Sequence, residues 1–392
     1  MVKIQVKSHD NAANGMHAFA SKFAKWKPAT DVFGDIQAVK TDFVQFDRAT
    51  GVNGFPLQRV VLVHGPNNGG KSMFCLGLLR SFINQGMPVL YVDSEYTLDR
   101  KYLSLIAGAS AIDSPLLVGL RPDDYEQVVD RVKEFAKNCL ESFESGDLPR
   151  KGFLIVVDSL RKLIPKDLMT KILKESADSG VDGMSGRAGQ LRASLNAAWM
   201  DQLVPLLAKT GGSIVFVVRE SEDTNATAMD RKYGKDFILQ GGKAVKYDSS
   251  LTIRIEQAGS VKPAGAEDKT VYGETHRGKI NKTKLSTKAT KTPVFYFHSS
   301  NGIASPAGLD TPRDVFQVAV EFGLVARTGA WYAFGDQRWQ GEHAAILYLS
   351  QNKDMLTELE DQVRANFSKF NPLETDEADE DNTNLLQRLA KK

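Results

Sequence analysis

The feature that most constrains this chain is an apolar segment that runs into a glycine-rich turn and then into a helical pattern. Residues 60–64 read Val-Val-Leu-Val-His and are followed by Gly-Pro-Asn-Asn-Gly-Gly-Lys-Ser. A strand, a Gly-x-x-x-x-Gly-Lys-Ser loop and a helix in this order form a P-loop, in which backbone N–H groups and the helix N-terminus surround phosphate oxygens. The sequence therefore predicts a nucleotide-phosphate site formed by Gly65, Pro66, Asn67, Asn68, Gly69, Gly70, Lys71, Ser72 and Met73.

Side chains of four polar residues supply the chemistry that such a site needs. Lys71 offers a positive charge to the β- and γ-phosphates, and Ser72 offers a hydroxyl to Mg²⁺. The apolar segment that ends at Asp158 has the form of a Walker B strand, so Asp158 is expected to hold the Mg²⁺ through water. Glu95 follows another apolar segment, at the strand edge where ligands bind. It is the candidate for orienting and polarising the attacking water, and an exposed strand-end carboxylate is the plain alternative.

Composition places the chain among globular proteins with more than one domain. It has 392 residues, of which 42% are hydrophobic and 25% charged, and its net charge is +2. No apolar run approaches the roughly 20 residues of a membrane span, and the N-terminus lacks an apolar signal core, so a cytoplasmic protein with no membrane partner is expected. Only Cys75 and Cys139 are present, which indicates neither a disulfide framework nor a cysteine zinc site. Cys75 is interpreted as a buried structural thiol.

Strand-like and helical segments alternate through the central part of the chain. The strand-like segments are Arg59–His64, Pro88–Asp93, Phe153–Asp158, Ser213–Val218 and Ser250–Glu256. The helical segments between them include Met73–Gln85, Tyr125–Phe143 and Gln190–Lys209. Nearly continuous apolar strands that alternate with helices predict an α/β fold with a mainly parallel sheet covered on both faces.

The two ends of the chain differ in composition from this centre. An apolar stripe formed by Met16, Phe19, Ala20 and Phe23 predicts a short N-terminal helix, packed either on the chain's own core or on a neighbouring subunit. Residues 273–299 are interpreted as a basic hairpin or loop. Beyond Pro306 a smaller unit is expected, with a helix over 314–322 and a last helix that carries Leu356, Leu359, Val363 and Phe367. The acidic stretch from Leu373 predicts disorder.

Several segments together resemble the RecA recombinase family. Residues 42–56 are similar to the family's segment before the P-loop, and residues 93–102 to the segment with the catalytic glutamate and the adenine contacts. The resemblance extends over most of the chain. It implies a P-loop RecA-like core in which Glu95 is the general base, while Asp99 and Tyr102 lie on either side of the adenine. The implied domains are 1–38, an N-terminal helix and polymerisation arm; 39–300, the ATPase core; 301–372, a small α/β C-terminal domain; and 373–392, the acidic tail.

Two further regions resemble the family's DNA-binding loops. Residues 178–192 are similar to the first loop with the helix after it, and residues 220–247 to the second loop. Backbone N–H groups at a glycine pair can approach phosphate closely, and basic side chains add charge. Without the resemblance, such loops would be interpreted as solvated connections. The implied DNA contacts are Gly183, Met184, Arg187, Gly241, Gly242, Lys243 and Lys246.

Other positions either match the family or depart from it. Lys282 and Lys284 resemble the paired lysines that reach the γ-phosphate of a neighbouring subunit, and the segment 328–334 resembles the family's small C-terminal domain. Arg219 stands at the strand end where cellular members have a glutamine. It is expected to contact the phosphate as a permanent cation, which leaves its coupling to DNA open. The departures suggest a diverged member, and a bacteriophage source is one interpretation.

The resemblance leads to one main hypothesis and two alternatives. The first is an ATPase that uses Mg²⁺, forms a helical filament of itself on single-stranded DNA, and pairs that strand with homologous duplex DNA. Single-strand-binding and loading proteins are further partners that the resemblance suggests. The alternatives are a hexameric RecA-fold helicase and an ATP-binding recombination mediator that exchanges no strands. A complete hydrolytic set argues against the mediator, because a protein that only binds ATP has no use for it.

Overall fold

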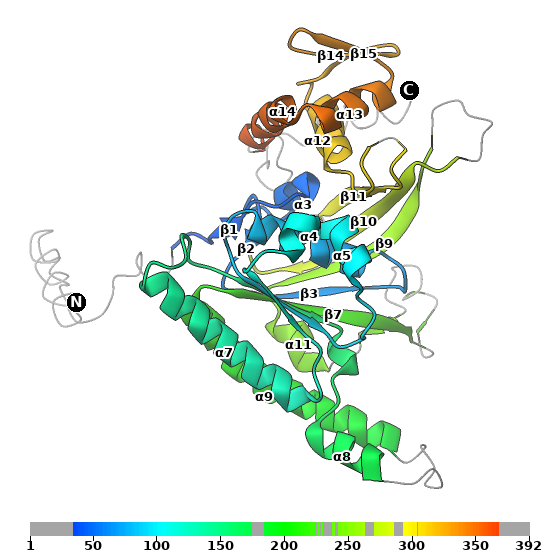
Figure 1. Cartoon of the computed structure of the whole chain (residues 1–392). Helices are drawn as coiled ribbons and strands as arrows, with labels where there is room; N and C mark the ends of the chain where they lie inside the picture. Colours follow the sequence, from blue (N-terminus) through cyan, green and yellow to red (C-terminus); the bar gives the residue numbers. More distant parts are fainter. Residues whose placement is uncertain are drawn as a thin grey trace, which may run out of the picture. The chain divides into compact units, whose positions relative to one another are not determined.

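The computed structural model describes residues 34–174, 184–223, 226, 227, 229, 237–239, 242–262, 270–285, 293–303 and 305–367. Nearly all of these residues belong to one compact unit that begins at Gln37. Its centre is a large sheet of ten described strands, part of which is labelled in Figure 1. Among the described helices, none combines the length and the apolar character that a bilayer span requires.

Six neighbouring strands of this sheet are parallel. They are β9 (Leu251–Val261), β3 (Val60–Gly65), β7 (Ser213–Glu222), β6 (Leu154–Asp158), β4 (Val89–Asp93) and β5 (Leu117–Leu120). Every residue of β3, β4 and β6 is buried, as expected for parallel strands covered on both faces. The predicted α/β fold with a mainly parallel sheet is confirmed.

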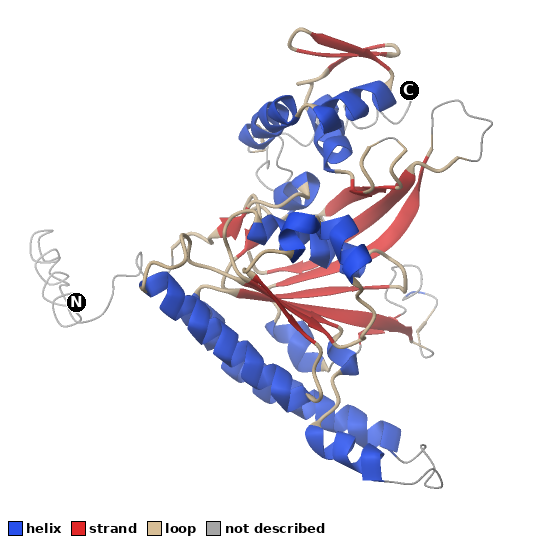
Figure 2. Ribbon diagram, in the orientation of Figure 1, coloured by secondary structure: helices blue, strands red, loops and turns tan. Residues whose placement is uncertain are grey.

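Helices lie on both faces of the sheet (Figure 2). On one face are α4 (Lys71–Ile83) and α5 (Arg100–Ala107), and on the other are α7 (Tyr125–Glu144) and α9 (Met184–Thr210). Helix α7 buries Val128, Val132, Ala136 and Cys139, a spacing that forms one apolar stripe toward the sheet. Cys75 on α4 is fully buried, in agreement with its interpretation as a structural thiol.

Antiparallel strands extend the sheet beyond β9. These are β10 (Gly273–Thr283), β11 (Val294–Ser300) and β12 (Gly308–Leu309). The described parts of 273–299, β10 and β11, pair antiparallel as in a hairpin, one of the two forms expected. The short β8 (Phe237–Leu239) pairs antiparallel with the end of β7. Strand β5 has no counterpart among the predicted strands, because a four-residue, partly exposed edge strand that contains Gly119 lacks a continuous apolar pattern.

The C-terminal part of the unit has its own apolar cluster. It comprises α12 (Thr311–Glu321), a small antiparallel sheet of β13 (Ala326–Thr328), β14 (Trp331–Phe334) and β15 (Gln337–Gln340), and the helices α13 (Glu342–Gln351) and α14 (Lys353–Ala365). Phe316, Leu349, Leu359 and Val363 lie at the centre of this cluster. Helices therefore form at both of the predicted C-terminal positions. The predicted boundaries of the domains stay a prediction.

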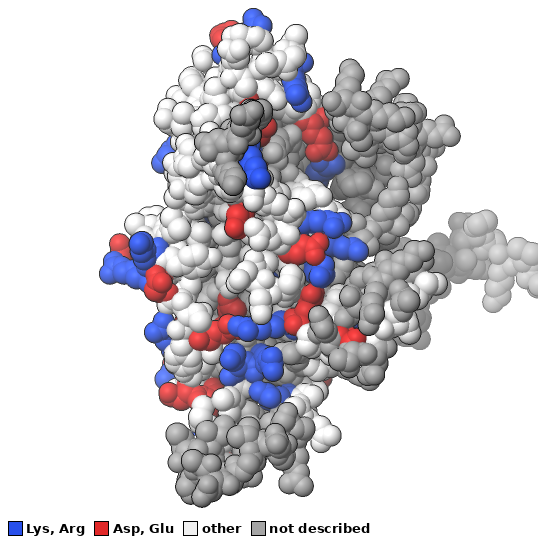
Figure 3. Space-filling view, turned by 90° about the vertical axis from the view of Figure 1, so that its right-hand side faces the viewer, with Lys and Arg blue, Asp and Glu red and all other residues white. Residues whose placement is uncertain are grey.

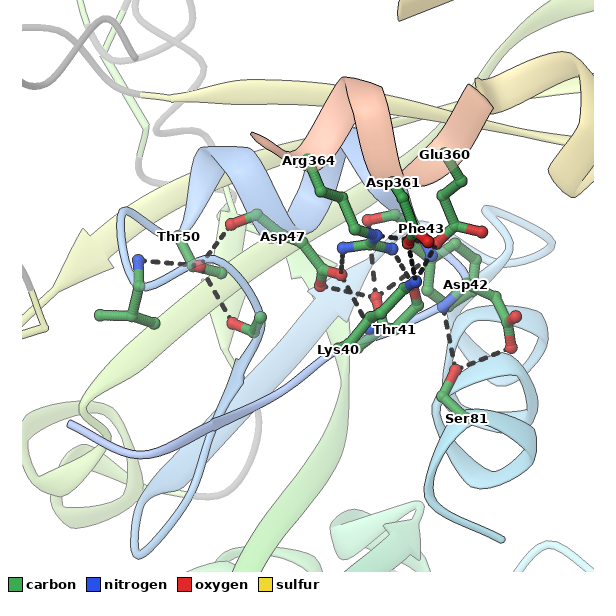
Figure 4. A network of polar contacts seen from close by, with 12 residues as sticks. Lys40, Thr41, Asp42, Phe43, Asp47, Thr50, Ser81, Glu360, Asp361 and Arg364 are labelled. Atoms are coloured by element: carbon green, nitrogen blue, oxygen red, sulfur yellow. Dashed lines mark hydrogen bonds and ion pairs between the residues drawn. The ribbon is translucent and has the colours of Figure 1, made fainter. Parts of the chain in front are cut away.

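Short elements complete the unit. Near its start are β1 (Ala38–Val39), α3 (Val44–Ala49) and β2 (Phe55–Pro56). Further along are α6 (Ala109–Ile112), the 3₁₀ helix η1 (Leu160–Lys162), α8 (Lys166–Lys174) and α11 (Lys243–Asp248). Helices α3 and α14 are joined by a polar network in which Arg364 reaches Asp47 and the carbonyl of Thr41 (Figure 4). The N-terminal helical stripe and the acidic tail lie outside the described residues.

Candidate active site

The P-loop and three strand ends meet at the carboxyl edge of the parallel sheet. Asp93 at the end of β4 is the register partner of Asp158 at the end of β6. Gly65 at the end of β3 is the register partner of Arg219 on β7. Because parallel neighbours end at the same edge, segments far apart in the sequence come together around the P-loop.

The glycines of the P-loop are required by close packing. Gly70 has a φ of +99° at the start of α4, and a Cβ there would lie 2.5 Å from Nδ1 of His276. A Cβ on Gly69 would lie 2.7 Å from the carbonyl oxygen of Ile255. His276 is buried, its Nδ1 lies 3.1 Å from the carbonyl oxygen of Gly69, and its ring stacks on Phe297. The loop is thus packed against residues of β9 and β10.

A cavity of about 750 Å³ opens over this loop. Its lining comprises seven P-loop residues (Asn67, Asn68, Gly69, Gly70, Lys71, Ser72 and Met73) together with Glu95, Thr97, Tyr102, Asp158, Arg219, Glu274 and His276. The cavity therefore brings together most of the residues that the sequence predicts for phosphate, metal and catalysis. Thr97, Glu274 and His276 were not predicted, because they carry no motif.

Lys71 points back over the turn that precedes it. Its Nζ donates to the carbonyl oxygens of Gly65 at 3.1 Å and of Pro66 at 2.6 Å. Gly65 and Pro66 thus hold the lysine through their carbonyl groups. Burial lowers the pKa of Lys71, while the nearby carboxylate of Asp158 acts in the opposite direction.

Ser72 and Asp158 are in direct contact at the base of the cavity. The Ser72 hydroxyl donates to Oδ2 of Asp158 at 2.7 Å, and the Tyr91 hydroxyl donates to the same oxygen at 2.9 Å. Burial raises the pKa of Asp158, with a further contribution from the charge of Glu95 and against the hydrogen bonds from Ser72 and Tyr91. A hydroxyl beside a carboxylate matches the oxygen ligands that Mg²⁺ prefers. Tyr91 was not predicted, since it lies within an apolar strand.

Glu95 is held by two partners from other strand ends. The Ser159 hydroxyl donates to Oε1 of Glu95 at 2.6 Å, and the guanidinium of Arg219 contacts both carboxylate oxygens. Burial raises the pKa of Glu95, but Ser159 and Arg219 outweigh this effect and hold the pKa below its ordinary value. Glu95 is therefore an ionised carboxylate at neutral pH, aimed at the cavity.

Comparison with known proteins identifies the family of the chain. The family model of the RecA N-terminal domain matches residues 25–304, and that of the RecA C-terminal domain matches residues 313–368. The chain belongs to the RecA family. It is 27% identical to Protein RecA of Acholeplasma laidlawii over 85% of this chain and 88% of that protein. It is 28% identical to Protein RecA of Bordetella pertussis over 86% of this chain and 84% of that protein.

The two residues expected at the adenine differ in their contacts. Tyr102 lines the cavity, and burial raises the pKa of its hydroxyl. The carboxylate of Asp99 accepts a hydrogen bond from the backbone N–H of Tyr102 at 2.8 Å and caps the N-terminus of α5. Asp99 thus fixes the helix that carries Tyr102.

Lys282 and Lys284 lie away from the cavity of their own RecA-type core. On β10, Lys282 is the register partner of Thr252 near the start of β9. Thr252 in turn is the register partner of Leu62 on β3, and the P-loop begins only at the end of β3. Their Nζ atoms donate to carbonyl groups at the end of α11. Lys282 contacts those of Lys246 and Tyr247, and Lys284 contacts that of Tyr247. The two lysines are therefore absent from the lining of the cavity of their own chain.

The predicted DNA contacts are only partly within the described residues. Gly183 and Gly241 lie outside them, as do the side chains of Met184, Arg187 and Lys243. Gly242 precedes α11 with a φ of +89°, and Lys246 is exposed in the last turn of that helix. On the face drawn in Figure 3, basic and acidic side chains are interspersed among the residues that are coloured. The DNA contacts remain predictions.

Proposed function

We propose that this RecA-family chain is a DNA-dependent ATPase that polymerises on single-stranded DNA and catalyses homologous pairing and strand exchange. The observation that carries the proposal is the convergence of Lys71, Ser72, Asp158 and Glu95 on one cavity. These residues come from a loop and two strand ends, and together they form a hydrolytic set rather than a binding site alone.

The residues present fit ATP and Mg²⁺. The Ser72 hydroxyl and the Asp158 carboxylate are 2.7 Å apart and would hold the metal ion. A side chain at Gly69 or Gly70 would clash with Ile255 or His276. The backbone of these two glycines would lie against the phosphates, and Lys71 would bind the phosphates as a point charge. When bound, Mg²⁺ neutralises charge on the phosphate oxygens.

Glu95 has the properties of a general base in this reaction. Its carboxylate is ionised at neutral pH, and Ser159 and Arg219, which hold the pKa below its ordinary value, also fix its orientation. An ionised carboxylate can orient water and accept its proton. Arg219, which lines the same cavity, adds a permanent positive charge for the phosphate in place of the glutamine of cellular relatives.

Lys282 and Lys284 would complete the ATP site of a neighbouring subunit. Neither lysine lines the cavity of its own chain, and their exposed amino groups contact only carbonyl groups at the end of α11, which supports this role. A head-to-tail assembly would bring the lysines of one copy to the cavity of the next, and such heterologous contacts generate filaments or rings. The ATP site would then be shared between two subunits.

DNA binding would involve the two loop regions and their basic side chains. Lys246 and Gly242 are the described members of the predicted set, and they lie at the two ends of α11. Binding through phosphate contacts predicts an affinity that falls steeply with salt and shows little base preference.

The proposal is tested by steady-state ATP hydrolysis with and without single-stranded DNA. Wild type is mixed in varying ratio with the double variant Lys282→Ala/Lys284→Ala. We expect strong stimulation by DNA that declines non-linearly as variant subunits are added. Absence of stimulation, or activity proportional to the wild-type fraction, would refute the shared site and favour the mediator. Closed rings with unwinding activity would instead favour the helicase.

A second variant tests the assigned base. Glu95→Gln keeps the size of the side chain but cannot accept a proton. We expect it to bind ATP and form filaments normally while turnover falls about 10²- to 10⁴-fold, the usual contribution of general base catalysis. Turnover near the wild-type rate would remove Glu95 from this role.

A further inference from the structure

The turn after β4 places Glu95 beside a residue with an unusual backbone conformation. Tyr96 has a φ of +58°. Positive φ is costly for residues other than glycine, asparagine and aspartate, because the Cβ crowds the backbone. A tyrosine keeps this conformation only when surrounding contacts impose it, and such positions are common at functional sites.

Contacts from the segment after β5 hold this turn. Arg121 donates from Nη2 to the carbonyl oxygen of Leu98 at 2.7 Å, and its Nε lies 3.4 Å from Oδ2 of Asp93. Asp93 in turn accepts hydrogen bonds from the backbone N–H groups of Thr97 and Leu98. The two ends of the turn are thus fixed by Asp93 and Arg121.

The Tyr96 side chain provides the contact at the apex of the turn. Its hydroxyl donates a hydrogen bond to the carbonyl oxygen of Pro122. The guanidinium of Arg121 lies 5.9 Å from the centre of the ring. The side chain is 56% exposed and borders a small hollow of about 230 Å³, so packing alone does not hold it. The hydroxyl is therefore the main anchor of the ring.

We propose that Tyr96 is a positioning residue that aims Glu95 at the cavity. Its hydroxyl fastens the positive-φ turn to Pro122, and this fixes the direction in which the preceding Cα of Glu95 presents its side chain to Ser159 and Arg219. The inference rests on the proposed function, in which Glu95 is the base. Tyr96 acts through the backbone of its neighbour and touches none of the reacting groups.

Two substitutions at this position separate the anchor from the ring. Tyr96→Phe keeps the ring and its contact with Arg121 but loses the anchor, while the cost of positive φ remains. We expect kcat for DNA-stimulated ATP hydrolysis to fall about fivefold, the size of one net hydrogen bond. KM for ATP and the affinity for single-stranded DNA should stay at wild-type values. Tyr96→Gly adopts positive φ without strain, so its kcat should equal or exceed that of Tyr96→Phe.

The matched control is Tyr296→Phe on β11, which removes the hydroxyl of another partly exposed tyrosine, 39% exposed, outside the cavity lining. It should retain the kcat of wild type. The inference is overturned if Tyr96→Phe has wild-type kcat, or if Tyr96→Gly is far less active than Tyr96→Phe, because the ring would then matter more than the anchor. A wild-type protein with no DNA-stimulated hydrolysis would overturn the proposed function instead, so the two failures are distinguishable.

Discussion

Arg364 and Asp47 form a buried ion pair that connects α14 to α3 (Figure 4). Arg364 Nη1 lies 2.6 Å from Oδ2 of Asp47, and Nη2 donates to the carbonyl oxygen of Thr41 at 2.6 Å. Asp47 is completely buried, and burial raises its pKa to about 6 against the effect of the Arg364 charge. We predict that Arg364→Met, which keeps much of the side-chain length but removes the charge, strongly reduces the free energy of unfolding.

The structure sets the size of this loss. Removing one partner of a buried ion pair costs about 3–5 kcal/mol, because the other charge stays buried without compensation. Asp47 would keep two hydrogen bonds from Thr41, from the backbone N–H and the hydroxyl, both at 2.7 Å. We therefore expect the lower end of the range, about 3 kcal/mol near neutral pH.

The effect of pH follows from the pKa of Asp47. Because the folded-state pKa is raised, protonation of Asp47 stabilises the fold fully at low pH, and this contribution is lost as the pH rises through about 6. Removing the Arg364 charge raises this pKa further. A protonated carboxyl group needs no cation, so the destabilisation by Arg364→Met should shrink to about 1.5 kcal/mol near pH 5.

Urea unfolding, followed by circular dichroism and by tryptophan fluorescence, measures both effects. The double variant Arg364→Met/Asp47→Asn should regain at least half of the lost stability. The control is Arg48→Met, which breaks the more exposed pair with Glu321, 3.0 Å apart, and should cost about 1 kcal/mol or less. A loss for Arg364→Met that is equal at both pH values and is not restored by Asp47→Asn would refute the reasoning and point to packing of the arginine stem.

Two further predictions concern the P-loop and a second buried acid. Gly70→Ala would place a Cβ 2.5 Å from His276 Nδ1 at a φ of +99°. Binding of a fluorescent ATP analogue to this variant should therefore weaken roughly tenfold or more. An affinity equal to that of wild type would contradict the packing argument. Burial raises the pKa of Asp314 to about 6 although His298 lies 2.5 Å away, so the stability that Asp314 contributes at low pH is lost as the pH rises through that value. Urea unfolding of Asp314→Asn should therefore show a free energy of unfolding that rises by about 2 kcal/mol relative to wild type between about pH 4 and pH 7. A difference between the two proteins that stays constant with pH would contradict the raised pKa of Asp314.

Much of the fold could be predicted because the strands and helices of the core have regular apolar patterns. The buried strands β3, β4 and β6 begin within one residue of their predicted starts. Strand β5 and the short β8 escaped prediction, because edge strands of three or four residues have too little pattern to be distinguished from loops. Their existence depends on neighbours that are far away in the sequence.

The sequence by itself determined the parts of the site that are contiguous. Gly69, Gly70, Lys71 and Ser72 lie next to one another, so the chemistry of the P-loop is visible in the order of the residues. The tertiary structure decided which groups hold Glu95. Ser159 and Arg219 are 64 and 124 residues away from it and meet it only because β4, β6 and β7 are neighbours in the sheet. Strand order results from the packing of the whole chain, and no local pattern encodes it.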